Sequence, residues 1–289
     1  MINHAQLRAF HAVAAQGSFT RAAAALNVTQ PTLSGQVKAL EDRFGIKLFE
    51  RRGRGIEPTE LGRSLHGVTR RIFALENEAE GLLAAARGLK RGSLKVSADA
   101  PYHIIPLLAT FNRRHPGITL SVSFGNSETV RAAVLGRLTD IAVLPDVEPD
   151  ERLHAQGFQR ERIVGVIERD HPWGSRRSIR LSDLAEECLI KREQGSTTRA
   201  ILERAMARAG VAAGAVMEVG SREAVREAVA ARLGIGTVFE SEFGNDERLK
   251  PLVIRDRGLE AMEYAVCLAE RRDSPAVRAF FDLLPEPAD

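Results

Sequence analysis

The chain has 289 residues, of which 44% are hydrophobic and 27% charged, a composition typical of a globular protein with room for two or three domains. No apolar run reaches the roughly 18–20 residues that span a bilayer, and no charged-then-apolar leader precedes a small-residue cleavage site, so we expect a cytoplasmic protein without a membrane partner. The two cysteines, Cys188 and Cys267, are isolated among apolar residues, which excludes a disulfide framework or a cysteine metal site and predicts reduced core side chains.

The net charge of +3 is unevenly distributed along the chain. Residues 1–92 carry 14 basic against 8 acidic residues, whereas the remainder carries 27 against 30. A basic head on a slightly acidic body favours contact between the head and a polyanion, although charged surfaces are often simply solvated.

Three short helices are predicted in the head. An apolar stripe from Leu7 to Ala14 indicates the first, which ends at Gly17. Ser18 can cap a second helix over 19–26, and an Asn-Val turn at 27–28 leads to the third, which Thr29 or Gln30 can cap.

The third helix has an unusual outer face. Its buried side is predicted to carry Leu33, Val37, Leu40 and Phe44, at helical spacing. The opposite face has small or polar residues: Pro31, Thr32, Gly35, Lys38 and Ala39, with Ser34 at its margin. Short side chains let a helix backbone approach base edges in the major groove, so we interpret it as a recognition helix; an ordinary helical hairpin is the alternative.

A two-stranded wing is predicted after this helix. Residues 45–62, GIKLFERRGRGIEPTELG, contain a short apolar strand, an arginine-rich tip and a return through Ile56. Arginines at such a tip can reach phosphates or a narrow minor groove, whereas the simpler interpretation is a basic surface turn.

Residues 1–90 resemble the DNA-binding end of the LysR-type transcriptional regulators. The resemblance rests on LRAFHAVAAQGSFTRAAAALNVTQPTLSGQVKALEDRFGIKLFERRGRGIEPTELG and continues more loosely over the rest of the chain. It implies double-stranded operator DNA as a partner, and a set of contact residues: Gln30, Pro31, Thr32, Ser34 and Lys38 on the recognition face, Ser18 and Thr20 near the DNA backbone, and Arg52 and Arg54 on the wing. Gly35 departs from the family, which often has arginine or another long polar residue there.

A long helix should connect head and body. Thr59 can cap a helix from Glu60 that runs for about 29 residues to the glycines at 88 and 92. Its apolar residues alternate at spacings of four and three: Leu61, Leu65, Val68, Ile72, Leu75, Ala79, Leu82 and Ala86. This seam favours pairing with a second copy, although the helix could instead pack on its own domain. In the family this helix is similarly the dimer seam, four-subunit assembly is common, and RNA polymerase is a further partner to consider.

The body is predicted to be α/β. From residue 93 short apolar strands alternate with helices in two series, which indicates two lobes joined by crossing strands near residues 162–165 and 264–266. The resemblance implies a periplasmic-binding-protein-like effector domain. The expected domains are a winged helix-turn-helix over 1–58, a linker helix over 59–90 and an effector domain over 91–289, with lobe I about 91–162 plus 266–289 and lobe II about 163–265.

A cleft between the lobes is the expected ligand site, where strand ends meet helix N-termini. Two loops carry the candidate anion contacts: Asn126 and Ser127 in GNSET, and Ser196, Thr197, Thr198 and Arg199 in REQGSTTR. These residues could also serve as plain helix caps. Asp99 and Tyr102 stand where the family more often has serine or threonine, and Glu240 ends another strand, so the cleft would carry both signs of charge. We therefore expect a zwitterionic effector, an amino acid or amino-phosphonate, unless Asp99 only caps the next helix.

Other functions are less well supported. Dinucleotide, P-loop, metalloprotease and nucleophile-elbow motifs are missing from the sequence, the body's histidines have no metal-ligand spacing, and neither cysteine has an activating neighbour in sequence, so we expect no enzyme activity and no cofactor. An architectural DNA-compacting protein would be basic along most of its length. A ligand-independent regulator with a vestigial cleft remains an alternative.

Overall fold

The computed structural model describes residues 2–52, 55–85 and 92–286. It contains two units, residues 1–80 and 81–289, each with its own hydrophobic core. Among the described residues, no helix combines the length and the apolar character that a bilayer crossing requires.

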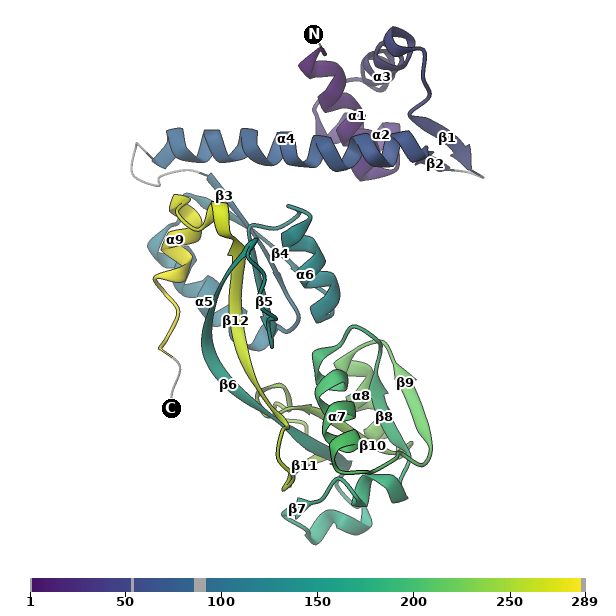
Figure 1. Cartoon of the computed structure of the whole chain (residues 1–289), viewed down its shortest axis with the longest axis vertical. Helices are drawn as coiled ribbons and strands as arrows, with labels where there is room; N and C mark the ends of the chain where they lie inside the picture. The colour runs from purple at the N-terminus through teal and green to yellow at the C-terminus, as the bar shows by residue number, and fades with distance from the viewer. Residues whose placement is uncertain (1, 53–54, 86–91, 287–289) are drawn as a thin grey trace. The chain divides into compact units, whose positions relative to one another are not determined.

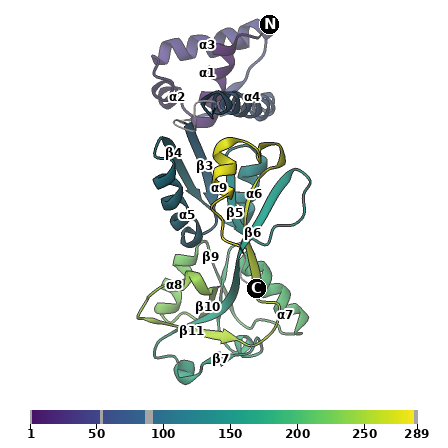
Figure 2. The ribbon, with the colours of Figure 1, turned by 90° about the vertical axis from the view of Figure 1, so that its left-hand side faces the viewer.

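Three helices form the core of the first unit, α1 (His4–Gln16), α2 (Phe19–Ala25) and α3 (Gln30–Phe44) (Figure 2). The α1 helix ends at Gly17, whose left-handed φ of 59° lets its N–H donate to the Val13 carbonyl. The alanines of α1 and α2 are small enough for the helices to pack closely around Leu33 and Val37. The three predicted helices are therefore confirmed.

The wing and the long helix follow. Strands β1 (Phe49–Arg52) and β2 (Gly55–Pro58) pair antiparallel, and the Thr59 hydroxyl accepts a hydrogen bond from the Gly62 N–H at 3.0 Å as α4 (Glu60–Ala85) begins. The predicted last turn of this helix lies in residues 86–91, outside the described part of the chain.

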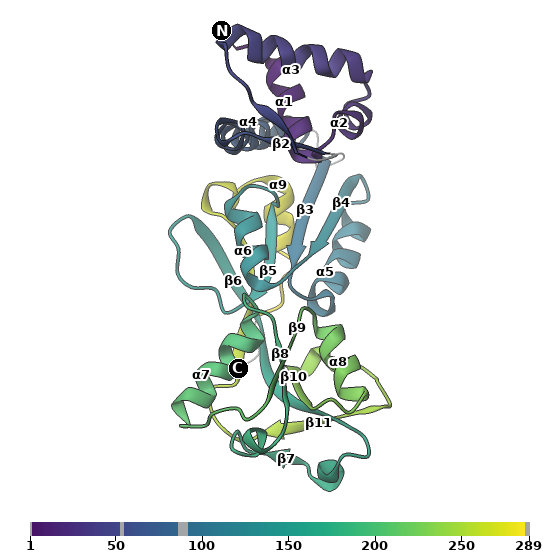
Figure 3. The same cartoon turned by 90° about the vertical axis from the view of Figure 1, so that its right-hand side faces the viewer.

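The second unit contains two lobes. The first is a sheet covered on one face by α5 (Pro101–Arg114) and α9 (Pro275–Phe281) and on the other by α6 (Ser127–Leu135) (Figure 3). Its strands in spatial order are β4 (Ile118–Phe124), β3 (Gly92–Ala98), β5 (Ile141–Pro145), β12 (Glu260–Leu268) and β6 (Leu153–Glu168). The first three are parallel, as expected of a βαβ series. The β12 strand runs antiparallel to both of its neighbours, β5 and β6.

The second lobe is built on the other half of β6. Its helices α7 (Thr197–Arg208) and α8 (Arg222–Ala230) cover opposite faces of a second sheet. That sheet adds strands β10 (Ile235–Phe239), β8 (Leu189–Arg192), β9 (Val216–Val219), β11 (Leu249–Ile254) and β7 (Ser178–Ile179). Short 3₁₀ turns complete the unit: η1 (Pro172–Ser175), η2 (Asp183–Glu186), η3 (Glu240–Glu242) and η4 (Ala269–Arg271).

Two crossing strands join the lobes, as Figure 1 shows for β6 and β12. The β6 strand changes partners between Arg162, which pairs with β12, and Ile163, which pairs with β10, so the first predicted crossing is confirmed. The second prediction, at 264–266, is wrong, because β12 already pairs with β6 at Glu260. Glu263 faces inward on β12, and a buried acid interrupts the apolar alternation by which a strand is recognised.

One further prediction is wrong, and two strands were missed. Phe44, expected on the buried face of α3, is 50% exposed, because it lies in the last turn, beyond the contacts that bury Leu40. Strands β7 and β11 were not predicted; β11 contains Pro251, which weakens a strand signal.

Glu41 connects α3 to the wing. Its buried carboxylate accepts hydrogen bonds from the backbone N–H groups of Leu48, at 2.7 Å, and Phe49, at 3.3 Å, where the chain leaves the helix. Lys47 contacts the same carboxylate from the surface at 3.3 Å. The orientation of the wing therefore depends on one buried acceptor.

We predict that Glu41→Ala lowers the unfolding free energy of the first unit by about 2–3 kcal/mol, because two backbone donors lose a charged acceptor. Chemical denaturation of the full chain, followed by a probe in residues 1–80, measures this. Lys47→Ala is the matched control and should cost less than about 1 kcal/mol, since its exposed ion pair is screened. If Glu41→Ala and Lys47→Ala lowered the unfolding free energy equally, the backbone hydrogen bonds to Glu41 would not be the source of the stability.

Candidate functional site

The predicted recognition face is the exposed side of α3. Thr29 is the N-cap: its hydroxyl accepts from the Thr32 N–H at 3.4 Å, and Pro31 occupies the first turn, where no N–H is needed. The residues of this helix that are predicted to contact DNA point away from the core: Gln30, Pro31, Thr32 and Lys38 are exposed, and Ser34 is half-buried. Leu33, Val37 and Leu40 fill the opposite side.

Gly35 lies on the same exposed face. A Cβ atom added there would meet no other atom within 4 Å, and its φ is not left-handed. Neither packing nor backbone conformation within the chain therefore requires glycine, although glycine costs a helix roughly 0.5–1 kcal/mol relative to alanine.

The other predicted DNA contacts lie around this helix. Thr20 is exposed on α2, and Ser18 is half-buried and caps α2 by accepting from the Arg21 N–H at 3.4 Å. Arg52 ends β1, where its backbone pairs with Gly55. Arg54 lies outside the described residues.

An apolar stripe follows one side of α4. Leu61, Val68, Ile72 and Leu75 are between 37% and 54% exposed, whereas Thr69 and Phe73 on another side are buried. The predicted seam is therefore apolar and uncovered over this part of the helix; Leu65 is the half-buried member.

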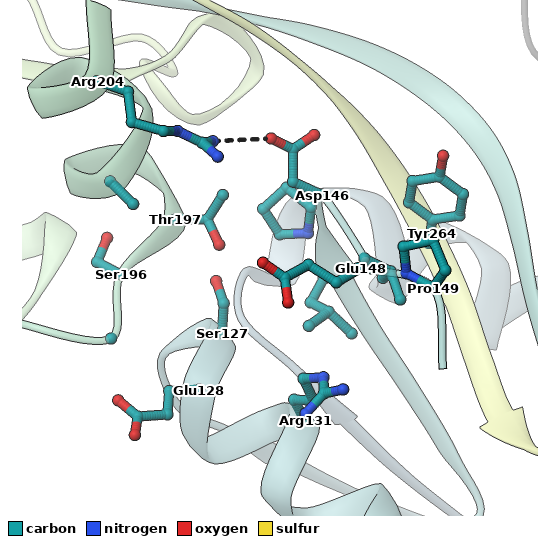
Figure 4. Close-up of a pocket in the computed structure, with 15 residues that line it drawn as sticks. Ser127, Glu128, Arg131, Asp146, Glu148, Pro149, Ser196, Thr197, Arg204 and Tyr264 are labelled. Atoms are coloured by element: carbon teal, nitrogen blue, oxygen red, sulfur yellow. Dashed lines mark hydrogen bonds and ion pairs between the residues drawn. The ribbon is translucent and has the colours of Figure 1, made fainter. Parts of the chain in front are cut away.

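The second unit has a cavity of about 560 Å³ between its lobes, drawn in Figure 4. Ser127, at the start of α6, lines it from the first lobe, and Ser196 and Thr197, at the start of α7, line it from the second. Figure 4 shows the hydroxyls of Ser127 and Thr197 pointing toward one another. Both helix N-termini thus face one space. The first-turn N–H groups of α7 have no partner among the described residues and favour an anion, whereas at α6 the Glu128 N–H already donates to the Gly195 carbonyl and the Thr129 N–H to Asn126.

The hydroxyls at the α7 terminus are not consumed by capping. Ser196 occupies the N-cap position, but its side chain accepts no cap hydrogen bond. By contrast, Asn126 does cap α6, accepting from the Thr129 N–H at 3.0 Å, while its amide donates to the Gln194 carbonyl of the other lobe at 3.2 Å. Asn126 therefore joins the lobes beside the cavity.

The cavity lining carries both signs of charge. Arg204 pairs with Asp146 at 3.3 Å, across the lobes, and Arg131 pairs with Asp150 at 2.8 Å. Two more acids line the cavity, Glu128 and Glu148, and neither has an ion-pair partner among the described residues. Sequence reasoning missed Arg131, Asp146, Glu148, Arg204 and Tyr264, because each comes from a helix face, a loop or, for Tyr264, a strand that carries no motif.

The other predicted effector residues do not line this cavity. Arg199 pairs with Glu203 and Glu218, at 3.1 and 2.6 Å. Glu240 pairs with Arg162 at 2.6 Å, and both line a second cavity of about 720 Å³ along the crossing strands. Thr198 is buried at the start of α7, and Tyr102 is half-buried in the first turn of α5.

Asp99 does not cap α5: the N-cap residue is Ala100, and the helix has no side-chain cap hydrogen bond. Instead it belongs to a buried charged cluster at the lobe junction. Ser127 donates to Asp99 at 3.3 Å, and Arg222 of the second lobe donates to the Asp99 carbonyl. Arg222 also contacts Glu242, with a distance of 3.1 Å between Nη2 and Oε1.

Glu161 and Glu263 on the crossing strands complete this cluster, which we call the acidic junction: Asp99, Glu161, Glu242 and Glu263. His103 contacts Glu161 at 2.9 Å and Ser241 at 3.1 Å. Burial raises the pKa of Glu242 to about 7. Burial, with the neighbouring carboxylates second, raises the pKa of Glu263 well above its usual range, and burial also raises the pKa of Asp99.

Comparison with known proteins supports one family over the whole chain. The family model described as "Bacterial regulatory helix-turn-helix protein, lysR family" matches residues 4–63, and the model "LysR substrate binding domain" matches residues 87–288. A relative named "RuBisCO operon transcriptional regulator", from Allochromatium vinosum, is 35% identical over 95% of this chain and 93% of its own.

Solved structures show the same fold. Full-length CbnR complexed with its target DNA superposes with a TM-score of 0.73 at 22% identity, covering 98% of this chain and 99% of its own. The regulatory domain of Synechocystis CcmR, solved in complex with 2-PG, gives a TM-score of 0.63 at 28% identity, covering 68% of this chain and all of its own.

Glu242 makes folding pH-dependent. The folded state holds a proton up to pH about 7 that an unfolded chain releases near 4.5, so the folded state binds more protons in this interval. The unfolding free energy contributed by Glu242 should therefore fall as pH rises from about 4.5 to 7, by at most roughly 1.4 kcal/mol per pH unit.

We predict that Glu242→Gln removes this contribution, so that the difference in unfolding free energy between variant and wild type grows across the interval. Urea denaturation at half-unit pH steps measures it. Because Glu242 interacts with Asp99 and Glu263 through charge, the difference contains this coupling as well as the ionisation of Glu242 itself. Glu260→Gln, an exposed acid on β12, should run parallel to wild type. A Glu242→Gln curve parallel to wild type would refute the shift.

Proposed function

The chain belongs to the LysR family of bacterial transcriptional regulators, and from this membership we propose that it binds operator DNA through α3 and senses a small zwitterionic metabolite in its cleft. As a member of the family it is a DNA-binding regulator with an effector domain, and not an enzyme. Its action on chromosomal DNA would take place in the cytoplasm.

The exposed face of α3 supports the DNA role. Gln30 can form a two-point contact to an adenine edge, and Lys38 can contact phosphate. Gly35 supports close approach, because no other demand within the chain accounts for a missing side chain there. Arg52, at the end of β1, and Arg54, predicted at the wing tip but outside the described residues, would add phosphate contacts that carry no sequence preference.

The apolar stripe of α4 supports pairing between two copies. Val68 and Leu75 are more than half exposed in the single chain, and a partner helix would cover them. Two-fold pairing places two recognition helices on an inverted repeat, and pairing of dimers would give a tetramer. An effector that favours one lobe angle would then change the spacing of the DNA-binding heads, within the limit of its differential affinity.

The lining of the effector cavity carries the proposal for a zwitterion. The N-terminus of α7 can hold an acid group, while three cavity acids, Glu128, Asp146 and Glu148, outnumber the two arginines and favour a positive group as well. An amino acid or an amino-phosphonate has both groups. Because the CcmR regulatory domain was solved in complex with 2-PG, this ligand is the natural competing candidate for the cavity of this chain.

We predict that Gln30→Ala weakens binding to the cognate operator by about 1–3 kcal/mol and leaves binding to random DNA almost unchanged, because a base contact is lost. Arg52→Ala should weaken both similarly. Fluorescence anisotropy at fixed salt measures these affinities, and Gln156→Ala in the second unit is the control. Unchanged discrimination in Gln30→Ala would remove α3 from the recognition role.

We predict that glycine, β-alanine or 2-aminoethylphosphonate binds more tightly than plain dicarboxylates and 2-PG. Calorimetry measures affinity directly, and a ligand at a hundred times its dissociation constant should stabilise the chain by roughly 2.7 kcal/mol in a thermal-shift experiment. Preference for dicarboxylates or 2-PG would reject the zwitterion. Failure of every ligand to bind would favour the ligand-independent regulator.

A further inference from the structure

The acidic junction has too few positive partners. Four carboxylates that are each at least nine-tenths buried converge there, from the residue after β3 and from β6, η3 and β12. Arg222 is the guanidinium bonded directly to them, and His103 contacts Glu161. Arg192 lies close enough to act through charge, but its guanidinium already pairs with Glu193 at 2.8 and 2.9 Å.

Glu263 is the least satisfied member. It is 3% exposed, and among the described residues its carboxylate has no hydrogen-bond or ion-pair partner. A buried carboxylate without a partner is costly and either retains a proton or receives a cation. Arg222 is incomplete too, since its buried Nε has no acceptor within the described part of the chain.

The junction adjoins both cavities of the second unit. Ser127, which lines the effector cavity, is hydrogen-bonded to Asp99. On β12, Tyr264 lines the effector cavity, and because successive strand residues point to opposite faces, the Glu263 side chain lies on the other face of the sheet; Pro145, the ladder partner of Glu263 on β5, also lines the cavity. Glu161 lines the second cavity. The effector cavity therefore meets the junction at the hydrogen-bonded pair Ser127 and Asp99, with Glu263 behind Asp99 as seen from the cavity.

We propose that the acidic junction is the subsite for the ammonium group of the effector, with Glu263 as its principal partner. This rests on the proposed zwitterionic effector and names the residues that recognise its positive end. An ammonium group donates up to three hydrogen bonds and needs only acceptors around it. A metal ion fits less well, because no group of three or more His, Cys, Asp or Glu side chains in the described residues is arranged to hold one.

Ammonium binding would also couple the lobes. Asp99 follows β3 of the first lobe, whereas Glu242 lies in η3 of the second. Arg222 bridges them, contacting Glu242 at 3.1 Å and lying 3.9 Å from the Asp99 carboxylate. A second cation between the same acids would stabilise the arrangement in which the two lobes are in contact at the junction. The effector would then bind this arrangement more tightly than one with the lobes apart, and such a difference in affinity is what a regulatory change requires.

Proton release should accompany binding. The raised pKa values of Glu242 and Glu263 mean that the junction retains protons near neutrality, and an ammonium group favours the ionised carboxylates. Affinity for an amine should therefore rise with pH through about 7. The charged or titratable side chains around Glu263 are Asp99, His103, Glu161, Arg192, Arg222 and Glu242.

The test compares ligand pairs that differ only in the amine: β-alanine with propionate, and 2-aminoethylphosphonate with ethylphosphonate. Wild type, Glu263→Gln and the control Glu260→Gln are titrated by calorimetry in two buffers of different ionisation enthalpy. We expect the amine preference to fall about 10-fold or more in Glu263→Gln, with weaker proton release, while affinity for propionate and ethylphosphonate stays unchanged. Glu260→Gln should behave as wild type.

Folding does not confuse this test, because glutamine removes a costly buried acid and the thermal midpoint of unliganded Glu263→Gln should be at least that of wild type. If wild type prefers the amines and Glu263→Gln keeps that preference, the subsite is wrong and the zwitterion proposal stands. If wild type shows no amine preference, the zwitterion proposal itself fails.

Discussion

The architecture of the second unit depends on one strand shared by two sheets. The β6 strand hydrogen-bonds to β12 up to Arg162 and to β10 and β11 from Ile163 onward, so both lobes are attached to the same backbone ladder. A change in lobe angle must be absorbed where the partners change, since packed sheets on either side resist deformation. Glu161 and Arg162, at this exchange of partners, line the second cavity, and Glu161 also belongs to the acidic junction.

Placing charge at such a point has a physical cost and a physical use. Replacement of buried ionic groups by apolar residues of similar volume is often neutral or stabilising, so the junction is not explained by stability alone. An apolar junction would hold the lobes in one arrangement whatever the solution contained. A cluster with unequal numbers of acids and bases responds to protons and cations, and Glu263 supplies that imbalance without reaching the surface.

The sequence predicted the helices and strands far better than it predicted the acidic junction. Strand and helix periods located most of the α/β order. Capping residues and spacing predicted the three helices of the head, and the family resemblance identified them as a helix-turn-helix. The β12 crossing was misplaced because an inward-facing Glu263 disguises the strand, and β11 was missed because it contains a proline. The junction was largely missed, apart from Asp99, because β3, β6, η3 and β12 each contribute a single acid, and such acids have no mutual spacing along the chain.

Several residues are unexplained by the chain's own packing, and they coincide with the surfaces assigned to partners. Gly35 weakens a helix where a Cβ would meet nothing, and Val68 leaves an apolar side chain half in water. Ser196 occupies a cap position without capping, and Glu263 is a buried acid without a partner among the described residues. Natural sequences are locally consistent except where function overrides stability. Each exception here becomes intelligible with one addition: duplex DNA at Gly35, a second α4 at Val68, an acid group at Ser196 and an ammonium at Glu263.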